Sequence, residues 1–459
     1  MFFERIISEG LAASSYLIGS GREAAVVDPR RDIDVYLRMA REHCMKIKYV
    51  LETHRHEDFV LGSLALKAST GAVICRGKNP KVTYADRYLK DGETLAIGDM
   101  SIRALETPGH TTDSLSYVLY ESGTSDLPLM VFSGDALFAG SCGRVDLYGE
   151  SRRPECAAIL YSSLHEKLLP LGDQALLWPA HGAGSVCGKD ISDRDRTTLG
   201  YERRANPWLS LDWETFIARK VEEQPIYPSY FSRMESWNEQ GAPPLTATDL
   251  PRPVNVDDLA GALKEKDISL VDTRMPQAFA GGHIPGSISI FLDGMSVFPG
   301  WVLDLEKPVW LVTERPEDAL IASRYLARLG FDPVEGYLCG GFEKWQNLGL
   351  PIGHVGAISV DALKQMLDSG AIRLIDVREP DEWADGIVPG AEPIFFGELK
   401  DHLPSVPRDA PIAVMCSVGH RGSIGASILA QAGFTSVYNV LGGTTAWVNR
   451  GYPLTEYTP

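Results

Sequence analysis

The hydrophobic positions in the first half of the chain form short runs that alternate with longer helix-like stretches. Two apolar runs, 16–18 and 24–27, flank Gly19-Ser20-Gly21 and predict a hairpin. The stretch 33–43 is typical of a helix, and further strands are expected at 49–51, 105–107 and 129–132. This alternation predicts a layered α/β domain over residues 1–245.

The second half of the chain repeats one pattern. Residues 268–274 correspond to 372–378, and the turn 282–286 corresponds to 386–390. Two tandem copies of one small α/β domain, at 246–353 and 354–459, account for this repeat. The proline-rich stretches 241–244 and 251–253 predict a linker before the first copy.

Composition places the chain among soluble globular proteins of several domains. Its 459 residues are too many for one core, and 44% of them are hydrophobic. A net charge of −17 argues against nucleic acid and anionic membranes as partners. The chain shows no signal-peptide pattern and no apolar run of membrane-spanning length. Its seven cysteines have no paired spacing, so we expect a reduced, cytoplasmic setting.

Metal-binding side chains follow the predicted strands of the first domain on four loops. Strand-end loops are where scattered residues converge on one site, and histidine with aspartate suits Zn, Fe or Mn. The sequence therefore predicts a metal site among six residues: His54, His56, Asp58, His110, Asp135 and His181.

The stretch Thr53-His54-Arg55-His56-Glu57-Asp58-Phe59 resembles the T-H-x-H-x-D-H motif of the metallo-β-lactamase fold. The resemblance implies an αββα sandwich for the first domain. The chain departs from the motif at Phe59, where a histidine normally stands. In dinuclear hydrolases of this fold, the motif's aspartate and last histidine hold the second metal. Phenylalanine cannot coordinate, so we expect one metal ion per chain.

Residues 133–138, followed by Ser141-Cys142-Gly143-Arg144-Val145-Asp146, resemble the persulfide dioxygenase branch of this fold. Two histidines and one carboxylate form the facial triad of non-haem Fe(II) oxygenases. The resemblance implies one Fe(II) held by His54, His110 and Asp135, with hydrogen-bonding support from His56, Asp58 and His181. It also implies that a low-molecular-weight persulfide, such as glutathione persulfide, is oxidised with O2 to sulfite while its thiol is released.

Two further residues of the first domain are candidates for substrate contact. Arg144 can clamp a carboxylate or phosphate on the thiol carrier, because guanidinium binds such groups in bidentate fashion. Cys187 lies six residues after His181 in a glycine-rich loop. It either accepts and hands on a persulfide or is an ordinary buried cysteine.

The second repeat carries a cysteine at the end of an apolar strand, in the sequence from Cys416 to Arg421. Backbone N–H groups and a following helix would stabilise a thiolate or an anionic persulfide at Cys416, and Arg421 can add a cationic contact. This loop resembles the rhodanese active site, C-x-x-x-x-R, which implies a sulfurtransferase that carries sulfane sulfur on Cys416. The first repeat has Thr313 instead, with acidic neighbours and Pro316, so we expect an inactive rhodanese-like module.

The expected architecture is a metallo-β-lactamase sandwich followed by two rhodanese-like domains. The expected function is a persulfide dioxygenase joined to a sulfurtransferase in sulfide detoxification, with O2 and thiosulfate or sulfite as further partners, in a homo-oligomer. The rhodanese domain would either generate persulfide from thiosulfate or join persulfide sulfur to sulfite, and both directions stay open. Two rivals are a glyoxalase-II-like Zn thioester hydrolase and a non-enzymatic sulfur carrier in which Cys416 alone reacts.

Overall fold

The computed structural model describes residues 1–121, 123, 125–243, 245, 251–265, 267–332 and 334–457. It divides into two compact units, one of Met1–Leu245 with Ala327–Gly330 and one of Thr246–Leu326 with Phe331–Pro459. Within the described ranges, no helix is both long and apolar enough to cross a membrane.

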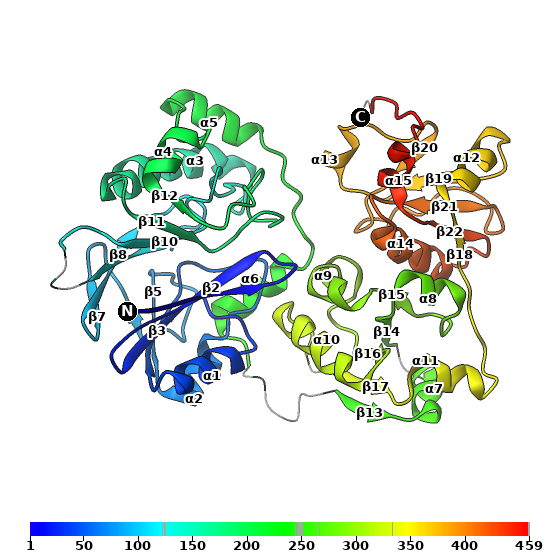
Figure 1. Ribbon diagram of the computed structural model, residues 1–459, viewed down its shortest axis with the longest axis horizontal. Coiled ribbons are helices and arrows are strands. Elements are labelled where there is room, and N and C mark those ends of the chain that lie inside the picture. The colour runs from blue at the N-terminus through cyan, green and yellow to red at the C-terminus, as the bar shows by residue number, and fades with distance from the viewer. Residues whose placement is uncertain are drawn as a thin grey trace. The chain divides into compact units, whose positions relative to one another are not determined.

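The first unit contains two sheets of six strands each (Figure 1). The first sheet runs in chain order through β1 (Phe2–Ser8), β2 (Ala13–Ser20), β3 (Glu23–Val27), β4 (Lys46–Leu51), β5 (Val73–Arg76) and β6 (Arg87–Tyr88). The second runs in reverse order through β12 (Thr197–Thr198), β11 (Leu176–Pro179), β10 (Met130–Gly134), β9 (Leu115–Glu121), β8 (Met100–Glu106) and β7 (Thr94–Ile97). β2 and β3 pair antiparallel, which confirms the predicted hairpin.

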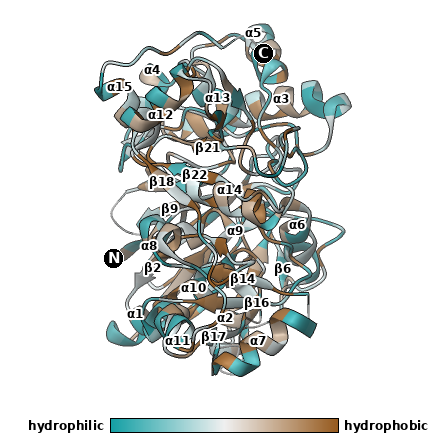
Figure 2. Cartoon of the chain, turned by 90° about the vertical axis from the view of Figure 1, so that its right-hand side faces the viewer, coloured by the Kyte–Doolittle hydropathy of each residue, from teal (hydrophilic) through white to brown (hydrophobic). Residues whose placement is uncertain are grey.

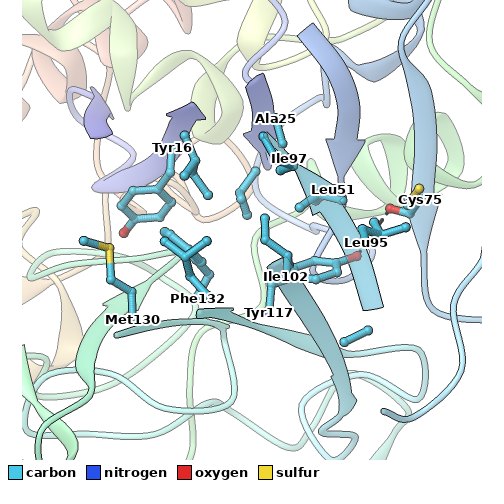
Figure 3. Close-up of a cluster of buried hydrophobic side chains, with 14 of the residues drawn as sticks. Tyr16, Ala25, Leu51, Cys75, Leu95, Ile97, Ile102, Tyr117, Met130 and Phe132 are labelled. Carbon is cyan, nitrogen blue, oxygen red and sulfur yellow. Dashed lines mark hydrogen bonds between the residues drawn. The ribbon is translucent and has the colours of Figure 1, made fainter. Parts of the chain in front are cut away.

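Three hydrophobic clusters make this unit a four-layer sandwich. The cluster between the sheets joins β2 and β4 to β9 and β10, and Figure 3 shows Tyr16 beside Phe132 there, with ring centroids 5.0 Å apart. A second cluster packs α1 (Asp34–Glu42) and α2 (Ser63–Thr70) on the first sheet. A third packs α3 (Arg153–Ser162) and α5 (Trp213–Glu222) on the second sheet. Each sheet therefore has one face against its partner and one against helices, as in the predicted αββα sandwich.

Shorter elements complete the first unit. Three helical turns flank or extend α3: η1 (Glu150–Arg152), η2 (Ser163–Leu168) and η3 (Leu169–Leu171). Two more helices, α4 (Leu199–Ala205) and α6 (Phe231–Gln240), follow β12 in the chain. Figure 2 shows hydrophilic colour on outer turns of helices such as α1, as expected where one helix face meets solvent.

The second unit contains two parallel sheets with the same topology. One has the order β13 (Arg252–Val254), β17 (Val334–Leu338), β16 (Val309–Val312), β14 (Ser269–Asp272) and β15 (Ile288–Ser289). The other has the order β18 (Gly356–Ile358), β22 (Val437–Val440), β21 (Ile412–Met415), β19 (Arg373–Asp376) and β20 (Ala391–Pro393). Identical orders confirm the predicted tandem repeat.

Helices accompany both sheets of the second unit. The first repeat has α7 (Val256–Glu265), α8 (Pro276–Gly281), η5 (Leu292–Ser296), α9 (Pro299–Val302), α10 (Pro316–Arg328) and α11 (Gly341–Asn347). The second has α12 (Val360–Asp368), α13 (Pro380–Trp383), α14 (His420–Gln431) and α15 (Gly443–Asn449).

One part of the predicted linker is wrong. Arg252 and Pro253 belong to β13, which pairs in parallel with β17. Proline is tolerated there because β13 is an edge strand and can leave one side of its backbone unpaired. Residue 244 of the predicted linker and residues 246–250, between its two stretches, lie outside the described residues, so the domain boundary near 245 stays a prediction.

Candidate metal centre and sulfur-transfer loop

The predicted metal ligands all lie in loops that follow strands of the first unit. The histidine loop follows β4, and His110, Asp135 and His181 come shortly after β8, β10 and β11. All six side chains are buried, none more than 1% exposed. Buried ionisable groups need an opposite charge, hydrogen bonds or a metal ion, so a cluster of six such groups is typical of a binding site.

The three residues expected to hold the metal face one another. Oδ2 of Asp135 lies 3.6 Å from Nε2 of His54 and 3.5 Å from Nε2 of His110. Among the described residues, neither of these histidine nitrogens has a hydrogen-bond partner. Metal–ligand bonds of about 2.0–2.2 Å place neighbouring ligand atoms about 3–3.6 Å apart. The three donors therefore fit a cation such as Fe(II) or Zn(II).

Hydrogen bonds on the opposite ring nitrogens fix the orientation of two of these histidines. Oγ1 of Thr53 lies 2.9 Å from Nδ1 of His54, and Thr53 is itself held by the carboxylate of Asp28. Nδ1 of His110 lies 2.9 Å from the backbone oxygen of Arg144. Such contacts leave Nε2 free to coordinate. Burial and the neighbouring His56 hold the pKa of His54 well below its usual range, which favours the neutral imidazole that binds metal.

His181 lies between two carboxylates. Its Nδ1 atom is 2.7 Å from Oδ1 of Asp135, and its Nε2 atom is 2.8 Å from Oδ2 of Asp58. Burial alone would lower the pKa of His181, but these two carboxylates raise it well above its usual range. Both ring nitrogens are engaged with protein groups, which agrees with a supporting role for His181.

His56 and Phe59 of the histidine loop lie close to Asp58 and His181. Nε2 of His56 lies 3.3 Å from Oδ1 of Asp28, and Nδ1 lies 3.9 Å from Oδ1 of Asp58. The Phe59 ring is 4.5 Å from the His56 ring and 6.3 Å from the His181 ring. Phe59 therefore places an apolar ring beside the three residues that could otherwise share a second cation, His56, Asp58 and His181.

The loop approaches the Asp135 strand so closely that one position requires glycine. Gly134 has φ +56°, and a Cβ atom there would lie 2.8 Å from Oγ1 of Thr53. A larger residue would displace Thr53 and, through it, His54. Sequence inspection alone gives no reason for this glycine.

Helix α6 covers the histidine loop, a role that the sequence did not reveal. Nδ2 of Asn238 donates to the backbone oxygens of His56 and Phe59, each at 2.8 Å, and its Oδ1 accepts from the N–H of Leu61 at 2.9 Å. One buried side chain thus satisfies three backbone groups of the loop. Because 182 residues separate Asn238 from His56, no local pattern could signal this contact.

A second residue missed by sequence reasoning is Glu57. It occupies a variable position of the motif, yet its side chain is fully buried, and it groups with His54 and His110 around one point. The sequence signal for Glu57 was its charge at a position between His56 and Asp58 of the motif.

The guanidinium of Arg144 is occupied within the protein. It makes two hydrogen bonds to the Asp146 carboxylate, at 2.7 and 2.6 Å, and donates to the backbone oxygens of Val186 and Ile226. These contacts tie the Cys187 loop to the loop after β10. They give Arg144 a structural role, and contact with a substrate carboxylate stays a prediction.

The thiol of Cys187 lies close to the metal ligands. Its sulfur, Asp135 and His181 offer ligand atoms within 4.8 Å of one another. Burial and the nearby Asp58 and Asp135 carboxylates raise the pKa of Cys187 well above its usual range. The neutral thiol is thereby favoured, and the proposed handling of a persulfide by Cys187 stays a prediction.

Cys416 follows β21 and precedes α14, as the sequence predicted. The N–H of Gly419 donates to its sulfur at 3.1 Å, and α14 begins at His420. The neighbouring Gly443 has φ +54°, and a Cβ atom there would lie 1.9 Å from the backbone oxygen of Cys416. Gly443 thus packs closely against the backbone of Cys416, and the sulfur accepts a hydrogen bond from the backbone N–H of Gly419.

Arg421 is held beside this loop by an acidic partner. It forms hydrogen bonds to both carboxylate oxygens of Glu382 and to Oγ of Ser417. Burial raises the pKa of Glu382, but Arg421, the Ser417 hydroxyl and the backbone N–H of Glu379 together lower it to about 2. The guanidinium therefore lies in a fixed position next to Cys416, with part of its charge balanced by Glu382.

The equivalent loop of the first repeat has no thiol. Asp272 pairs with Val312 and Asp376 pairs with Met415, so Thr313 and Cys416 occupy equivalent positions after their strands. Arg315 there is paired with Asp318 at 2.7 Å.

Comparison with known proteins identifies these domains. A metallo-β-lactamase superfamily model matches residues 9–184, and a rhodanese-like domain model matches 255–348 and 359–450. The mitochondrial persulfide dioxygenase ETHE1 of Bos taurus is 31% identical over 213 residues, which cover 44% of this chain and 74% of that protein. The chain belongs to the metallo-β-lactamase superfamily.

Two further proteins match this chain. A hydroxyacylglutathione hydrolase of Pseudomonas entomophila is 29% identical over 249 residues, or 48% of this chain and 91% of that protein. A solved metallo-β-lactamase structure from Staphylococcus aureus subsp. aureus COL has a TM-score of 0.65 and 30% identity, and covers 74% of this chain and 98% of its own. The predicted fold, with one metallo-β-lactamase domain and two rhodanese-like domains, is confirmed.

Proposed function

We propose that the first domain is an iron-dependent persulfide dioxygenase, in which one Fe(II) is held by His54, His110 and Asp135. One observation carries this proposal. Phe59 fills the position beside His56 and His181 where a dinuclear hydrolase needs another ligand. The persulfide dioxygenase relatives at 31% identity support the same reaction class.

The chain's own residues would bind and orient the reacting groups. Thr53 and the Arg144 backbone oxygen hold the two histidine ligands, and His181 holds the Asp135 carboxylate. Bound Fe(II) would supply redox chemistry with O2. The overall reaction is R-S-SH + O2 + H2O → R-SH + H2SO3, in which the terminal sulfur is oxidised and O2 is reduced. Phe59 and the surrounding buried groups limit access of bulk water.

The second rhodanese-like domain would carry sulfane sulfur on Cys416. The Gly419 N–H and the start of α14 stabilise an anionic sulfur, and Arg421 faces the same loop. Sulfite from the first domain could accept this sulfur to give thiosulfate, or thiosulfate could donate sulfur in the opposite direction. Joining both sites in one chain raises the local concentration of the labile persulfide.

The first rhodanese-like domain is proposed to be catalytically silent and to support its neighbour. Its Phe291 ring lies 4.3 Å from the ring of His420, inside the Cys416 loop. Oγ of its Ser289 lies 2.8 Å from Oγ of Ser423 on α14. It therefore packs against the element that begins at the active loop.

A second candidate is a zinc thioester hydrolase. The hydroxyacylglutathione hydrolase relatives favour it, and so does the group formed by His56, Asp58 and His181, which could hold a second ion. Phe59 at the edge of this group is the observation that speaks against it.

The proposal is tested by product analysis with glutathione persulfide under air. Wild-type protein should consume O2 and release sulfite, thiosulfate or both, while a Cys416→Ser variant should consume O2 at an unchanged rate and release sulfite alone. A Cys339→Ser variant, which changes an exposed cysteine, is the matched control. Loss of O2 consumption in Cys416→Ser would contradict the proposal that oxidation and sulfur transfer take place at separate sites. The absence of sulfite from all variants would contradict the proposed dioxygenase activity.

A further inference from the structure

Glu57 is a buried carboxylate that faces the centre formed by the metal ligands. Its Oε2 atom lies 3.6 Å from Nε2 of His110, and the ligand atoms of Glu57, His54 and His110 lie within 4.8 Å of one another. The side chain is fully buried. Oε2 has no hydrogen-bond partner in the part of the chain that the structure describes.

Only one of the two oxygens of this carboxylate, Oε1, has a hydrogen-bond partner among the described residues. Nη2 of Arg55 donates to Oε1 of Glu57 at 3.2 Å. The same guanidinium also serves two carboxylates of α6, Glu235 at 3.0 Å and Glu239 at 2.7 Å. Lys81 also lies 3.4 Å from Glu239, so two positive charges serve these three carboxylates. A buried carboxylate oxygen without a partner is costly, so Oε2 requires a further cationic neighbour.

We propose that Glu57 is itself a ligand of the metal ion, in addition to His54, His110 and Asp135. The inference rests on the proposed metal site but not on the identity of the substrate. The separation of 3.6 Å between Glu57 and His110 matches the 3.5 Å between Asp135 and His110, as expected for neighbouring ligands of one ion. One cation at this point would satisfy Oε2 of Glu57 and both unpartnered histidine nitrogens together.

This ligand set differs from the facial triad in two ways. A triad leaves three positions of an octahedral ion open, and Glu57 reduces them to two. Two carboxylates also balance the charge of a divalent ion and add a second hard oxygen donor, which favours Fe(II) or Mn(II) over softer ions. Compared with a site of three protein ligands, this site would bind its metal ion more tightly and leave fewer positions on the ion for substrate, O2 or water.

Arg55 acts as the positioning residue for this ligand. It lies next to His54 in the loop, and its hydrogen bond to Glu239 and ion pair with Glu235 fix the guanidinium against α6. Oε1 of Glu57 is held from that side, so Oε2 points toward the histidines. The helix that covers the loop thereby also orients one of its metal-facing groups.

The test is metal binding by the full-length chain with Glu57→Gln, which keeps the shape of the side chain but removes its charge. Metal-free protein is titrated anaerobically with Fe(II), and separately with Mn(II), against a chromophoric chelator. Glu57→Gln should lower the affinity by about 10-fold or more, since even supporting residues of a metal site contribute 10–100-fold. Glu57→Ala should give at least the same loss. Glu214→Gln, at an exposed position of α5, is the matched control and should bind as wild type does.

Thermal melting of the metal-free chain separates ligation from a merely structural role. If Glu57 is a ligand, Glu57→Gln should leave the metal-free Tm unchanged or raise it, because a buried carboxylate with one unpartnered oxygen is removed. Unchanged metal affinity together with a lower metal-free Tm would overturn the inference, since Glu57 would then serve only as a partner of Arg55.

Co(II) substitution supplies an independent readout. The visible absorption of the Co(II)-loaded chain reports the ligands around the ion, and Glu57→Gln should change its intensity and position. Identical spectra for wild type and Glu57→Gln would overturn the inference. A failure of the proposed function is recognised separately: wild type would show no O2 uptake with persulfide, while the affinity loss of Glu57→Gln would remain.

Discussion

The Nδ1 atom of His181 lies 2.7 Å from Oδ1 of Asp135, and its Nε2 atom is 2.8 Å from Asp58. This contact orients the carboxylate that faces His54 and His110. His181→Gln should therefore lower metal affinity about 10–100-fold, as expected when a partner of a ligand is lost. Anaerobic competition titration measures it, and His402→Gln, at an exposed position, is the control. Wild-type affinity in His181→Gln would show that Asp135 needs no such support.

Phe59 limits the site to one ion, so its replacement should change the stoichiometry. An imidazole at this position would lie beside His56 and His181, whose rings are 4.5 and 6.3 Å from the present phenyl ring. Phe59→His should bind about two Zn(II) per chain where wild type binds about one, because the new ligand joins Asp58 and His181. Elemental analysis of Zn(II)-loaded protein measures the ratio. Phe59→Leu should stay at one, and one Zn(II) in Phe59→His would contradict the role given to Phe59.

The ion pair of Arg421 with Glu382 predicts a pH dependence of stability. The pKa of Glu382 falls from 4.5 to about 2, because the contacts with Arg421, Ser417 and the backbone of Glu379 together outweigh the opposite effect of burial. A carboxylate whose pKa is lower in the folded state than in the unfolded state stabilises the folded protein. This stabilisation is complete above the unfolded-state pKa and is lost as the pH falls through the folded-state pKa. The contribution should thus be complete above pH about 4.5 and disappear toward pH about 2.

Glu382→Gln tests this expectation by calorimetry. At pH 7 it should destabilise the rhodanese-like unit by about 1–2 kcal/mol, less than the pKa change alone implies because a third of the side chain, 33%, is exposed. The difference from wild type should shrink at pH 3. Glu392→Gln, at an exposed position of β20, should show no difference at either pH. A difference of constant size at all pH values would assign the effect to packing.

Phe291 of the first repeat should influence sulfur transfer in the second. Its ring lies 4.3 Å from that of His420, between Cys416 and Arg421 in sequence. Ring contacts contribute about 0.5–1.5 kcal/mol, so Phe291→Ala should lower kcat/KM for thiosulfate sulfur transfer about 2–10-fold. Trp301→Ala, which removes a ring packed on Phe395 at the same junction, should have a smaller effect. Equal losses in both variants would show a general loss of packing.

The sequence predicted the parts of the site that are encoded locally. His54, His110 and Asp135 follow strands, and strand ends converge, so their meeting follows from the alternation of elements. The repeat predicted two copies of one α/β domain, which the two sheets of the same topology confirm, and the equivalence of Thr313 with Cys416. These features depend on spacing and residue type, which are visible in a single chain.

The missed features depend on contacts between distant segments. Asn238 reaches the histidine loop from α6, a helix far from that loop in the sequence. The sequence predicts that Arg144 contacts a carboxylate or phosphate of the substrate, and only the fold shows Asp146 and two backbone oxygens around it. Glu57 lies inside the motif, but its burial depends on the packing of α6 and could not be read from its position.

The central claim is that one iron ion in the first domain oxidises a persulfide. Its most direct test is metal quantification of anaerobically purified protein, followed by O2-electrode measurements with glutathione persulfide and with a hydroxyacylglutathione thioester. The account predicts about one iron per chain, O2 uptake with sulfite formation from the persulfide, and no thioester hydrolysis. Two zinc ions per chain, no O2 uptake and hydrolysis of the thioester would contradict it.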